Sequence, residues 1–435
     1  MNIKAKVSGL LLGLSCLLGA TTEAVAQGSD NRSPYSRYGY GSMEGGGTAG
    51  NRALGGLSIG LRDPLITNPG NPASYTSVDS LTFIFDLGVS ARYSFLREGS
   101  NSDRRLLGNL DYLSMLFPLG KRMAMSAGIM PLATTGYTFG SKATMGGDDN
   151  SDTFVRSYSG HGSYNQLYLG LAGRTFGGLH LGVNAAFIFG HSKHERQVTY
   201  TTVGALNRIN TSNLHLRGFK LDLGAQYELA LDTLGKRSLV FGATYTPGYR
   251  YSSELTTASY ESVSGSTTLK ELSSTVTKDG RYIMPDQFGA GVSYRKAGHY
   301  MYGVDVRYSA WDKAEFPNLE AEFRNQWRIA LGGEWTPNER ARSPWKRAKY
   351  RLGLNYGNSY LKVPVATSGR LEGYQEYGAS VGLALPLVDR RSALNFSIDY
   401  KMLRPEASGM ISEHYIGATI GITFNESWFR KARVN

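Results

Sequence analysis

The stretch LTFIFDLGVSARYSFL, residues 81–96, decides the fold class. Its odd-numbered positions are all hydrophobic or aromatic, whereas most of the intervening positions are polar, charged or glycine. An apolar residue at every second position indicates a β-strand with one apolar and one polar face. The run is long, because strands of globular proteins usually have about 5–6 residues.

The same alternation returns along the rest of the chain and predicts an even number of strands. We expect fourteen, near residues 81–96, 109–118, 122–140, 163–176, 178–200, 213–230, 237–251, 286–296, 299–311, 324–336, 347–361, 372–388, 391–403 and 413–424. Tight turns follow the even-numbered strands, whereas long polar loops such as 141–162, 201–212, 252–285 and 404–412 follow the odd-numbered ones. The link at 336–349 is the exception, since it is basic and long.

Short connections at one end of the strands and long connections at the other end are typical of a transmembrane β-barrel, whose short turns face the periplasm. We therefore predict an all-β protein in which residues 81–424 form a closed antiparallel transmembrane barrel of about 14 strands in the cell outer membrane. Residues 425–435 would be a C-terminal periplasmic tail. The expected partners of such a surface are outer-membrane lipid and lipopolysaccharide.

Composition supports this prediction by exclusion. The 435 residues include 54 Gly and 28 Tyr but a single Cys, which rules out a disulfide scaffold and Cys-rich metal sites. No apolar stretch beyond the N-terminus approaches the length of a membrane-spanning helix. The net charge of +12 falls largely in the predicted short turns and termini, which indicates a cationic periplasmic rim rather than a nucleic-acid site.

Residues 1–26 have the pattern of a removable secretory signal. Lys4 and Lys6 precede an apolar stretch, and Ala24-Val25-Ala26 provides a small-residue cleavage site. Cys16 lies in the apolar stretch and would leave with the signal. A lipoprotein signal at Cys16 is an alternative, although Gly13 occupies a position that prefers an aliphatic residue.

Residues 27–80 show no sustained period and contain eleven Gly and four Pro. A fourteen-stranded barrel is wider than side chains can fill, so this segment is predicted to be a hatch inside the lumen. Its Arg37, Arg52 and Arg62 could pair with lumen carboxylates. The alternation predicts a lumen charge network that includes Asp86, Arg92, Asp222, Glu228, Asp305, Arg307 and Arg328. The alternative, that these groups are simply hydrated, stays open.

Four motifs carry a resemblance to a known family. They are NRALGGL at 51–57, NPAS at 71–74, SPYSRYG at 33–39 and TFNESWF at 423–429. Together they resemble a branch of the FadL family of outer-membrane transport proteins, with the barrel shuttle protein of the type IX secretion system as a more distant relative. The resemblance implies a fourteen-stranded barrel, an N-terminal hatch and a kinked third strand that opens a lateral exit.

The resemblance also assigns residues to these parts. Met130 and Pro131 would form the lateral-opening kink, although an ordinary bulge is an alternative. The hatch residues would be Arg37, Arg52, Gly55, Gly56, Asn71, Pro72 and Ala73.

The sequence thus predicts a barrel that transports small hydrophobic molecules past a hatch and through a lateral opening. The alternative is a non-transporting subunit or scaffold of an outer-membrane secretion or assembly complex, with 252–285 and 336–349 as contact surfaces and other envelope proteins as partners. The charged lumen counts against a simple hydrophobic conduit.

Signals of catalysis and metal binding are weak. The match to a nucleophile elbow at residues 56–60 lacks the flanking strand and helix. His191 and His194 are three apart on a strand and point to opposite faces. The acidic stretch 148–152 could hold calcium but lacks the features of an EF-hand loop. We expect no enzyme activity, cofactor, metal or nucleic-acid partner.

Overall fold

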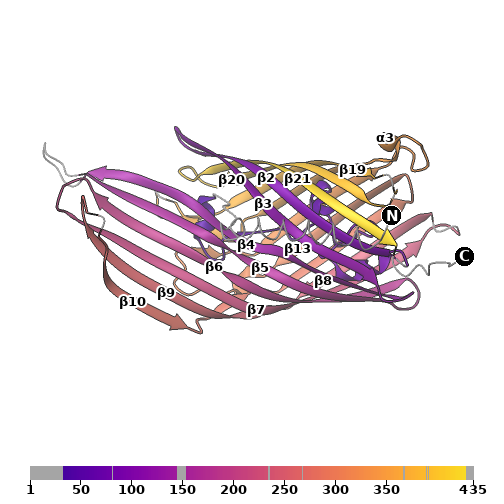
Figure 1. The fold of residues 1–435 in the computed structure, drawn as a ribbon, viewed down its shortest axis with the longest axis horizontal. Helices are drawn as coiled ribbons and strands as arrows, with labels where there is room; N and C mark the ends of the chain where they lie inside the picture. Colours follow the sequence, from indigo (N-terminus) through magenta and orange to yellow (C-terminus); the bar gives the residue numbers. More distant parts are fainter. Residues whose placement is uncertain are drawn as a thin grey trace, which may run out of the picture.

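The structure, a computed structural model, describes residues 33–80, 82–144, 153–233, 236–266, 268–365, 368–387, 389 and 391–427. Fourteen antiparallel strands form a closed barrel, because β2 pairs with β3 on one side and with β21 on the other (Figure 1). The fourteen are β2 (Thr82–Glu98), β3 (Asn101–Pro118), β4 (Met123–Thr144), β5 (Thr153–Arg174), β6 (Leu179–Tyr200), β7 (Leu206–Ala230), β8 (Arg237–Thr246), β12 (Gln287–Lys296), β13 (Tyr300–Ser309), β15 (Gln326–Trp335), β16 (Lys349–Asn358), β19 (Tyr374–Pro386), β20 (Ala393–Pro405) and β21 (Ser412–Ser427). The predicted fold class is confirmed.

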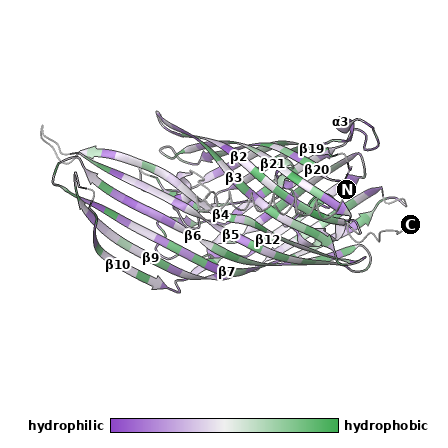
Figure 2. Cartoon of the chain, viewed as in Figure 1, coloured by the Kyte–Doolittle hydropathy of each residue, from purple (hydrophilic) through white to green (hydrophobic). Residues whose placement is uncertain are grey.

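The outer surface carries an apolar band bordered by aromatic residues. On β15 the exposed positions run from Trp327 through Ile329 and Leu331 to Trp335. Eight residues at about 3.4 Å each, tilted by about 40°, span about 20 Å along the barrel axis, close to the band of a membrane barrel. The hydrophobic residues are exposed because this face contacts lipid (Figure 2).

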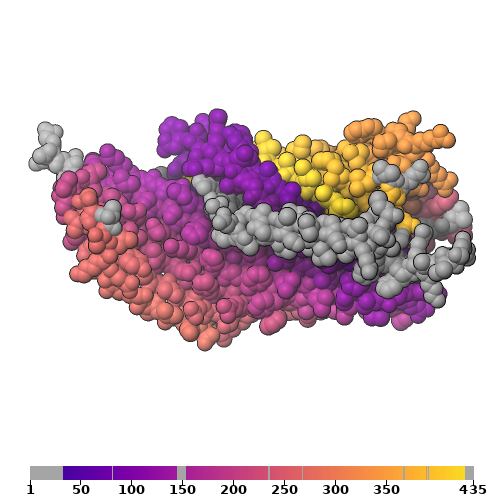
Figure 3. All heavy atoms as spheres, in the orientation of Figure 1, coloured from indigo at the N-terminus to yellow at the C-terminus, as the bar shows by residue number. Residues whose placement is uncertain are grey.

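One side of the barrel rises far beyond this band. On β7 the lipid-facing row ends at Phe219, yet the strand begins at Leu206, so about a dozen residues project roughly 30 Å further. Strands β4, β5 and β6 rise with it, and β9 (Tyr249–Val263) and β10 (Lys270–Lys278) continue this raised wall. Figure 3 shows the wall, coloured magenta to salmon, reaching beyond the last strands of the chain, which are coloured yellow.

The raised wall corrects the predicted loops. Most of 252–285 forms β9, β10 and β11 (Tyr282–Met284), and strands occupy much of 141–162 and 201–212. The reason is that a sheet surrounded by water on its outer side needs no apolar row. Strand β21 extends to Ser427, so residues 425–427 belong to the barrel and not to the predicted C-terminal tail.

At the opposite end the connections are short, with one exception. The link between β15 and β16 contains α3 (Pro344–Arg347). At the raised end, the connections contain η3 (Trp311–Lys313) and a small sheet of β14 (Glu322–Phe323), β17 (Leu361–Pro364) and β18 (Leu371–Glu372). None of the helices in the described residues is long and apolar enough to cross a membrane.

The N-terminal segment, residues 33–80, lies within the ring of strands (Figure 1). It contains η1 (Pro34–Arg37), β1 (Ser42–Met43), α2 (Ala49–Ala53) and η2 (Pro72–Ser77). Helix α2 contacts β16, β19, β20 and β21, whereas η2 contacts β4, β5, β6 and β7 on the other side of the barrel. The segment therefore bridges the lumen.

Candidate functional site: the N-terminal segment and the β3–β4 seam

The Asn-Pro-Ala motif shapes the C-terminal part of the N-terminal segment. Asn71 is the N-cap of η2 and its Oδ1 accepts a hydrogen bond from the Ala73 amide at 3.1 Å. Pro72 takes the first helical position, where no amide is needed. The Asn71 Nδ2 donates to the carbonyl of Ile59 at 2.8 Å, which joins this turn to the preceding loop.

Glycines allow the N-terminal segment to touch the wall through its backbone. Gly55 has φ of +70°, and a Cβ there would lie 2.8 Å from the Leu354 amide nitrogen. A Cβ on Gly353 of β16 would lie within bonding distance of the Gly55 nitrogen. Glycine is therefore required on both sides of this contact.

Asp305 of β13 holds the loop that follows. Its carboxylate accepts hydrogen bonds from the amides of Ser58 and Ile59 at 2.6 Å and of Gly60 at 3.1 Å. Three successive amides around one carboxylate form an anion nest in which the protein itself supplies the anion. Ser293 reinforces it by donating to the carbonyl of Gly60 at 2.7 Å.

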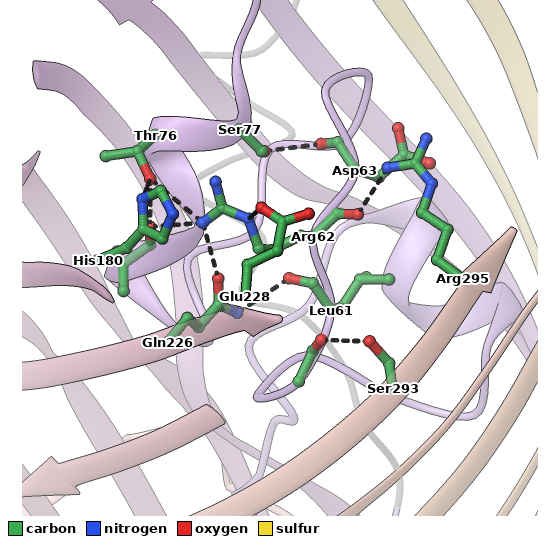
Figure 4. Close-up of polar contacts among 12 residues, drawn as sticks. Leu61, Arg62, Asp63, Thr76, Ser77, His180, Gln226, Glu228, Ser293 and Arg295 are labelled. Carbon is green, nitrogen blue, oxygen red and sulfur yellow. Dashed lines mark hydrogen bonds and ion pairs between the residues drawn. The ribbon is translucent and has the colours of Figure 1, made fainter. Parts of the chain in front are cut away.

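A polar cluster fixes Arg62, as Figure 4 shows. The guanidinium Nε lies 3.3 Å from Glu228, and Nη1 donates to Gln226 at 3.2 Å. Gln226 in turn donates to the carbonyls of Ile59 and Leu61. Arg62 is 7% exposed, so its charge is compensated almost entirely by protein groups.

The neighbouring Asp63 forms a buried ion pair with the wall. Its carboxylate lies 2.5 Å from Nζ of Lys349, which also contacts Glu334 at 3.1 Å. Burial alone would raise the pKa of Asp63, but Lys349 and Arg295 outweigh it and hold the pKa well below its usual value. Asp63 is therefore ionised throughout the physiological range.

The wall itself is incomplete between β3 and β4. Their ladder runs only from the Leu113–Ile129 pair to the Pro118–Ala124 pair. From this ladder towards the raised end, β3 pairs only with β2 and β4 pairs with β5, so β3 and β4 diverge. We call this gap the β3–β4 seam. Leu110 on the free part of β3 is 48% exposed and pairs with Val89 of β2, which in turn pairs with Ile420 of β21. Val89 and Ile420 are exposed members of the lipid-facing row, so the seam begins at the depth of that band.

The sequence Met130-Pro131 lies where β4 leaves β3. The β4–β5 register shifts between Pro131 and Ala133, and the shift follows directly on the last β3–β4 pair at Ile129. Proline lacks the amide that a continued ladder would require. A bulge also bends a strand, which turns the rest of β4 away from β3.

The N-terminal segment occupies the inner side of the seam. Ser42 and Met43 form β1 and pair with Thr134 and Ala133 of β4. The Glu44 amide extends this pairing by donating to the carbonyl of Leu132 at 2.9 Å. On the β3 side, Arg52 contacts Asp111 at 2.9 Å, and on neighbouring β2, Arg92 lies 4.0 Å from Glu44.

Two adjoining cavities in the lumen lie beside the inner side of the β3–β4 seam. The first has a volume of about 220 Å³ and the second about 120 Å³. They share the wall formed by residues 43–46, Arg307, Gln326 and Arg328. The smaller cavity is lined by Met130 and Leu132, so it meets the seam. We call the pair the seam cavity.

The seam cavity has both apolar and charged walls. Met43, Met130, Leu132 and Trp311 contribute apolar surface to the part near the seam. The charged wall combines a cationic and an anionic set, which are Arg52, Arg92, Lys220, Arg307, Arg328 and Lys401 against Glu44, Asp222, Asp305, Glu376 and Asp399. Such a cavity can accommodate an apolar body with a polar end.

The structure places the predicted charged residues in several separate groups. Asp86 accepts hydrogen bonds from Tyr112 and Thr423, while Asp222 pairs with Lys220 at 3.1 Å. Arg307 donates to Ser58 Oγ at 3.3 Å, and Arg328 lies 3.7 Å from Glu376.

Two predicted hatch positions lie apart from these contacts. Arg37 pairs with Glu320 in a loop at the raised end rather than with a lumen carboxylate. A Cβ on Gly56 (φ of +89°) would meet open space rather than the wall.

Several contacts escaped sequence reasoning. Asp111 and Tyr112 are both buried because a bulge near Gly88 shifts the β2–β3 register by one residue. Glu44 and Asp63 lie in the aperiodic segment, where alternation gives no direction. The one signal that the sequence offered for these contacts was that acidic and basic residues occur together in that segment.

The remaining candidates for chemistry are dispersed. Ser58 Oγ accepts from Arg307, and His191 faces outward whereas His194 contacts Tyr137 Oη at 2.8 Å. Among the described residues, no group of three His, Cys, Asp or Glu side chains is arranged to hold a metal. The predicted signal 1–26 and the acidic stretch 148–152 lie outside the described residues.

A closed fourteen-stranded barrel with an apolar outer band defines an outer-membrane β-barrel protein. The model of the BamG family matches residues 10–435, and the chain belongs to that family. No curated protein matches it.

Solved structures with the same fold include FadL-type proteins. The CymD monoaromatic hydrocarbon channel has 14% identity and a TM-score of 0.58, with 90% of this chain and 100% of that chain covered. The Ralstonia pickettii toluene transporter TbuX has 15% identity and a TM-score of 0.55, with coverage of 88% and 98%. A Pseudomonas aeruginosa FadL homologue has 11% identity and a TM-score of 0.59, with coverage of 89% and 99%. The predicted FadL-like recognition is confirmed at the level of the fold.

Proposed function

We propose that the protein passes small, mainly hydrophobic molecules between its lumen and the outer membrane through the β3–β4 seam. The observation that carries the proposal is that the seam lies at lipid depth, meets a cavity and is lined on its inner side by the short stretch Ser42–Glu44. An open strand edge facing hydrocarbon is costly unless something covers it. A removable cover at this position acts as a gate.

In this proposal the N-terminal segment is a hatch with two parts. A molecule enters from the raised end, binds in the seam cavity and leaves past Met130 and Pro131 after residues 42–47 withdraw. The FadL-type fold supports the proposal, since the titles of CymD and TbuX describe a hydrocarbon channel and a toluene transporter.

A disulfide lock tests the gate. The chain has one cysteine, Cys16 in the predicted signal, so new cysteine pairs can be introduced without competing thiols. Met43 and Ala133 are direct β partners, whose Cβ atoms are usually about 4.5–5.5 Å apart. We expect whole cells with the oxidised Met43→Cys/Ala133→Cys variant to take up radiolabelled toluene at least about fivefold more slowly than cells with the parent protein. Reduction of the disulfide should restore the rate.

The matched control locks a contact that the proposal leaves unchanged. Ala91 and Ala418 are partners in the continuous β2–β21 ladder. The Ala91→Cys/Ala418→Cys variant should transport at the normal rate whether oxidised or reduced. Normal uptake through a fully oxidised 43–133 lock would rule out passage at the seam.

A second candidate, a non-transporting subunit of an envelope complex, is favoured by the firm anchoring of residues 54–77. The contacts of Asp305, Arg62 and Asp63 leave little freedom to the base of the N-terminal segment. The raised wall adds an exposed edge, because β10 pairs only with β9 among the described residues. Native mass spectrometry from mild detergent decides this case: a stoichiometric partner that dissociates on deletion of 252–285, with normal toluene uptake after the 43–133 lock, favours the subunit.

A further inference from the structure

The short-turn end of the barrel contains a cavity of about 660 Å³, larger than either part of the seam cavity. Its floor is formed by Asp63 and Leu65 of the N-terminal segment, so it is separated from the seam cavity. Its walls come from the β12–β13 turn, the 336–349 connection and the β19–β20 turn. We call it the basal cavity. It faces the periplasm in an outer-membrane barrel.

Cations outnumber acids in the basal cavity. Six Lys and Arg residues line it, which are Arg295, Lys296, Arg340, Arg347, Lys349 and Arg391, together with His299. Four acids line it, which are Asp63, Asp79, Glu334 and Glu339. Lys349 binds Asp63 and Glu334, so removing these three leaves five cations against two acids.

Several of these cations have no acidic partner in the part of the chain that the structure describes. Within the described ranges, Arg295, Lys296, Arg340 and Arg347 form no ion pair within 4 Å, although Arg295 donates to the carbonyl of Arg62. The Nε of Arg347 is also buried without a hydrogen-bond partner. A buried donor without an acceptor is costly, and a ligand carboxylate would satisfy it.

We propose that the basal cavity binds an acidic peptide segment of a periplasmic protein. The cations come from three separate connections and surround the cavity instead of converging on one point, which suits several carboxylates along a chain better than one small anion. Trp345, 58% exposed on the same connection as Arg340 and Arg347, offers an apolar anchor of the kind that recurs at protein interfaces. The inference goes beyond the proposed function, because the basal cavity has no part in the seam.

A fluorescein-labelled hexaglutamate peptide serves as the probe for the full-length protein in detergent micelles. We expect fluorescence anisotropy to report micromolar binding that weakens with salt. The Arg340→Gln/Arg347→Gln variant should bind at least about tenfold more weakly, since each bidentate carboxylate contact is lost. Both residues lie on a surface connection, and heat-modifiable gel mobility verifies that the variant barrel is folded.

The matched control removes the same charge elsewhere. Arg156 and Arg208 are exposed on the raised wall, and the Arg156→Gln/Arg208→Gln variant should bind the peptide as the parent does. Equal weakening in both variants would show that only net charge matters and would overturn the proposal. It would also be overturned by displacement of the peptide by equimolar phosphatidylglycerol, which would identify a lipid site, or by absence of binding. Toluene uptake is measured in parallel, so failure here is distinct from failure of the seam proposal.

Discussion

The two parts of the N-terminal segment are held in opposite ways. Residues 54–77 are fixed by buried charges and by amides that donate to Asp305, whereas residues 42–47 are joined to the wall by the short β1–β4 ladder and line a cavity. Buried charged hydrogen bonds contribute more than neutral ones, and their loss leaves unsatisfied groups. The comparison teaches that residues 42–47 can move at a lower cost than residues 54–77.

This difference suits a gate that must not become a leak. In the proposed function, residues 54–77 would supply the permanent obstruction that a fourteen-stranded barrel needs. Residues 42–47 would then uncover the seam without opening a path across the membrane. The two parts should therefore differ in opening free energy, a quantity that hydrogen exchange measures segment by segment.

The largest effect is expected from Asp305→Ala. The substitution leaves the three amides of residues 58–60 without their acceptor, at about 1–3 kcal/mol for each buried donor. A total of about 3 kcal/mol raises the open population of residues 54–77 more than about a hundredfold. Hydrogen-exchange mass spectrometry should show that loss of protection in this stretch. Asp312→Ala, at an exposed carboxylate of η3, should leave exchange unchanged, and equal protection in both variants would refute the anchoring role.

A smaller effect is expected from Asn71→Ala. The variant loses the N-cap of η2 and the bond to the carbonyl of Ile59, together about 1–2 kcal/mol, or roughly tenfold in local opening. Asn71→Ser separates the two contributions, because serine caps the helix but cannot reach Ile59. If serine and alanine gave the same exchange rates, capping would contribute nothing.

The sequence predicted the lipid-facing part of the barrel well, for a physical reason. Lipid outside and polar groups inside impose alternation, so strands such as 81–96 are legible from the residues alone. The raised wall has water outside, where His191, Lys193 and His215 replace the apolar row. Where both faces of a strand are polar, the alternation of apolar and polar residues disappears. The strands of the raised wall were therefore predicted as loops.

The site was less legible. Alternation predicted that Asp305 faces the lumen, but its partners are backbone amides, which leave no trace in the sequence. Asp111 lies at a bulge that changes the facing of every residue above it, so counting odd and even positions fails there. The seam is a place where β3 and β4 do not pair. Pro131 was the one residue whose type indicated such an interruption in the sequence.

A moderate effect on passage is expected from Pro131→Thr. Threonine supplies the missing amide and favours extended strands, so β4 can follow β3 further and narrow the seam. Toluene uptake should fall about threefold, with residues 58–63 as protected as before, because their anchors Asp305, Glu228 and Lys349 belong to other strands than β4. Pro118→Thr, at the end of the intact ladder, is the matched control. Faster uptake after Pro131→Thr would contradict the assignment of the exit.

The smallest effect, none at all, is expected when the parent protein is acidified from pH 8 to pH 5. The pKa of Asp63 is lowered by Lys349 and Arg295, so its contribution to stability is complete above the unfolded pKa of about 3.9 and is lost only as the pH falls towards the lower native value. Exchange protection of residues 63–66, the stretch that Asp63 itself anchors, should therefore stay constant over this range after correction for intrinsic rates.

Lys349→Met reverses the sign of this pH dependence. Without the ammonium group, burial raises the pKa of Asp63, and a raised carboxyl pKa makes the folded state more stable at low pH than at high pH. Protection of residues 63–66 should then increase on acidification. Lys362→Met removes an exposed lysine paired with Glu322 and should retain the flat profile of the parent. A flat profile for Lys349→Met would mean that Arg295 alone keeps Asp63 ionised, which would move the anchor from the β15–β16 side of the barrel to β12.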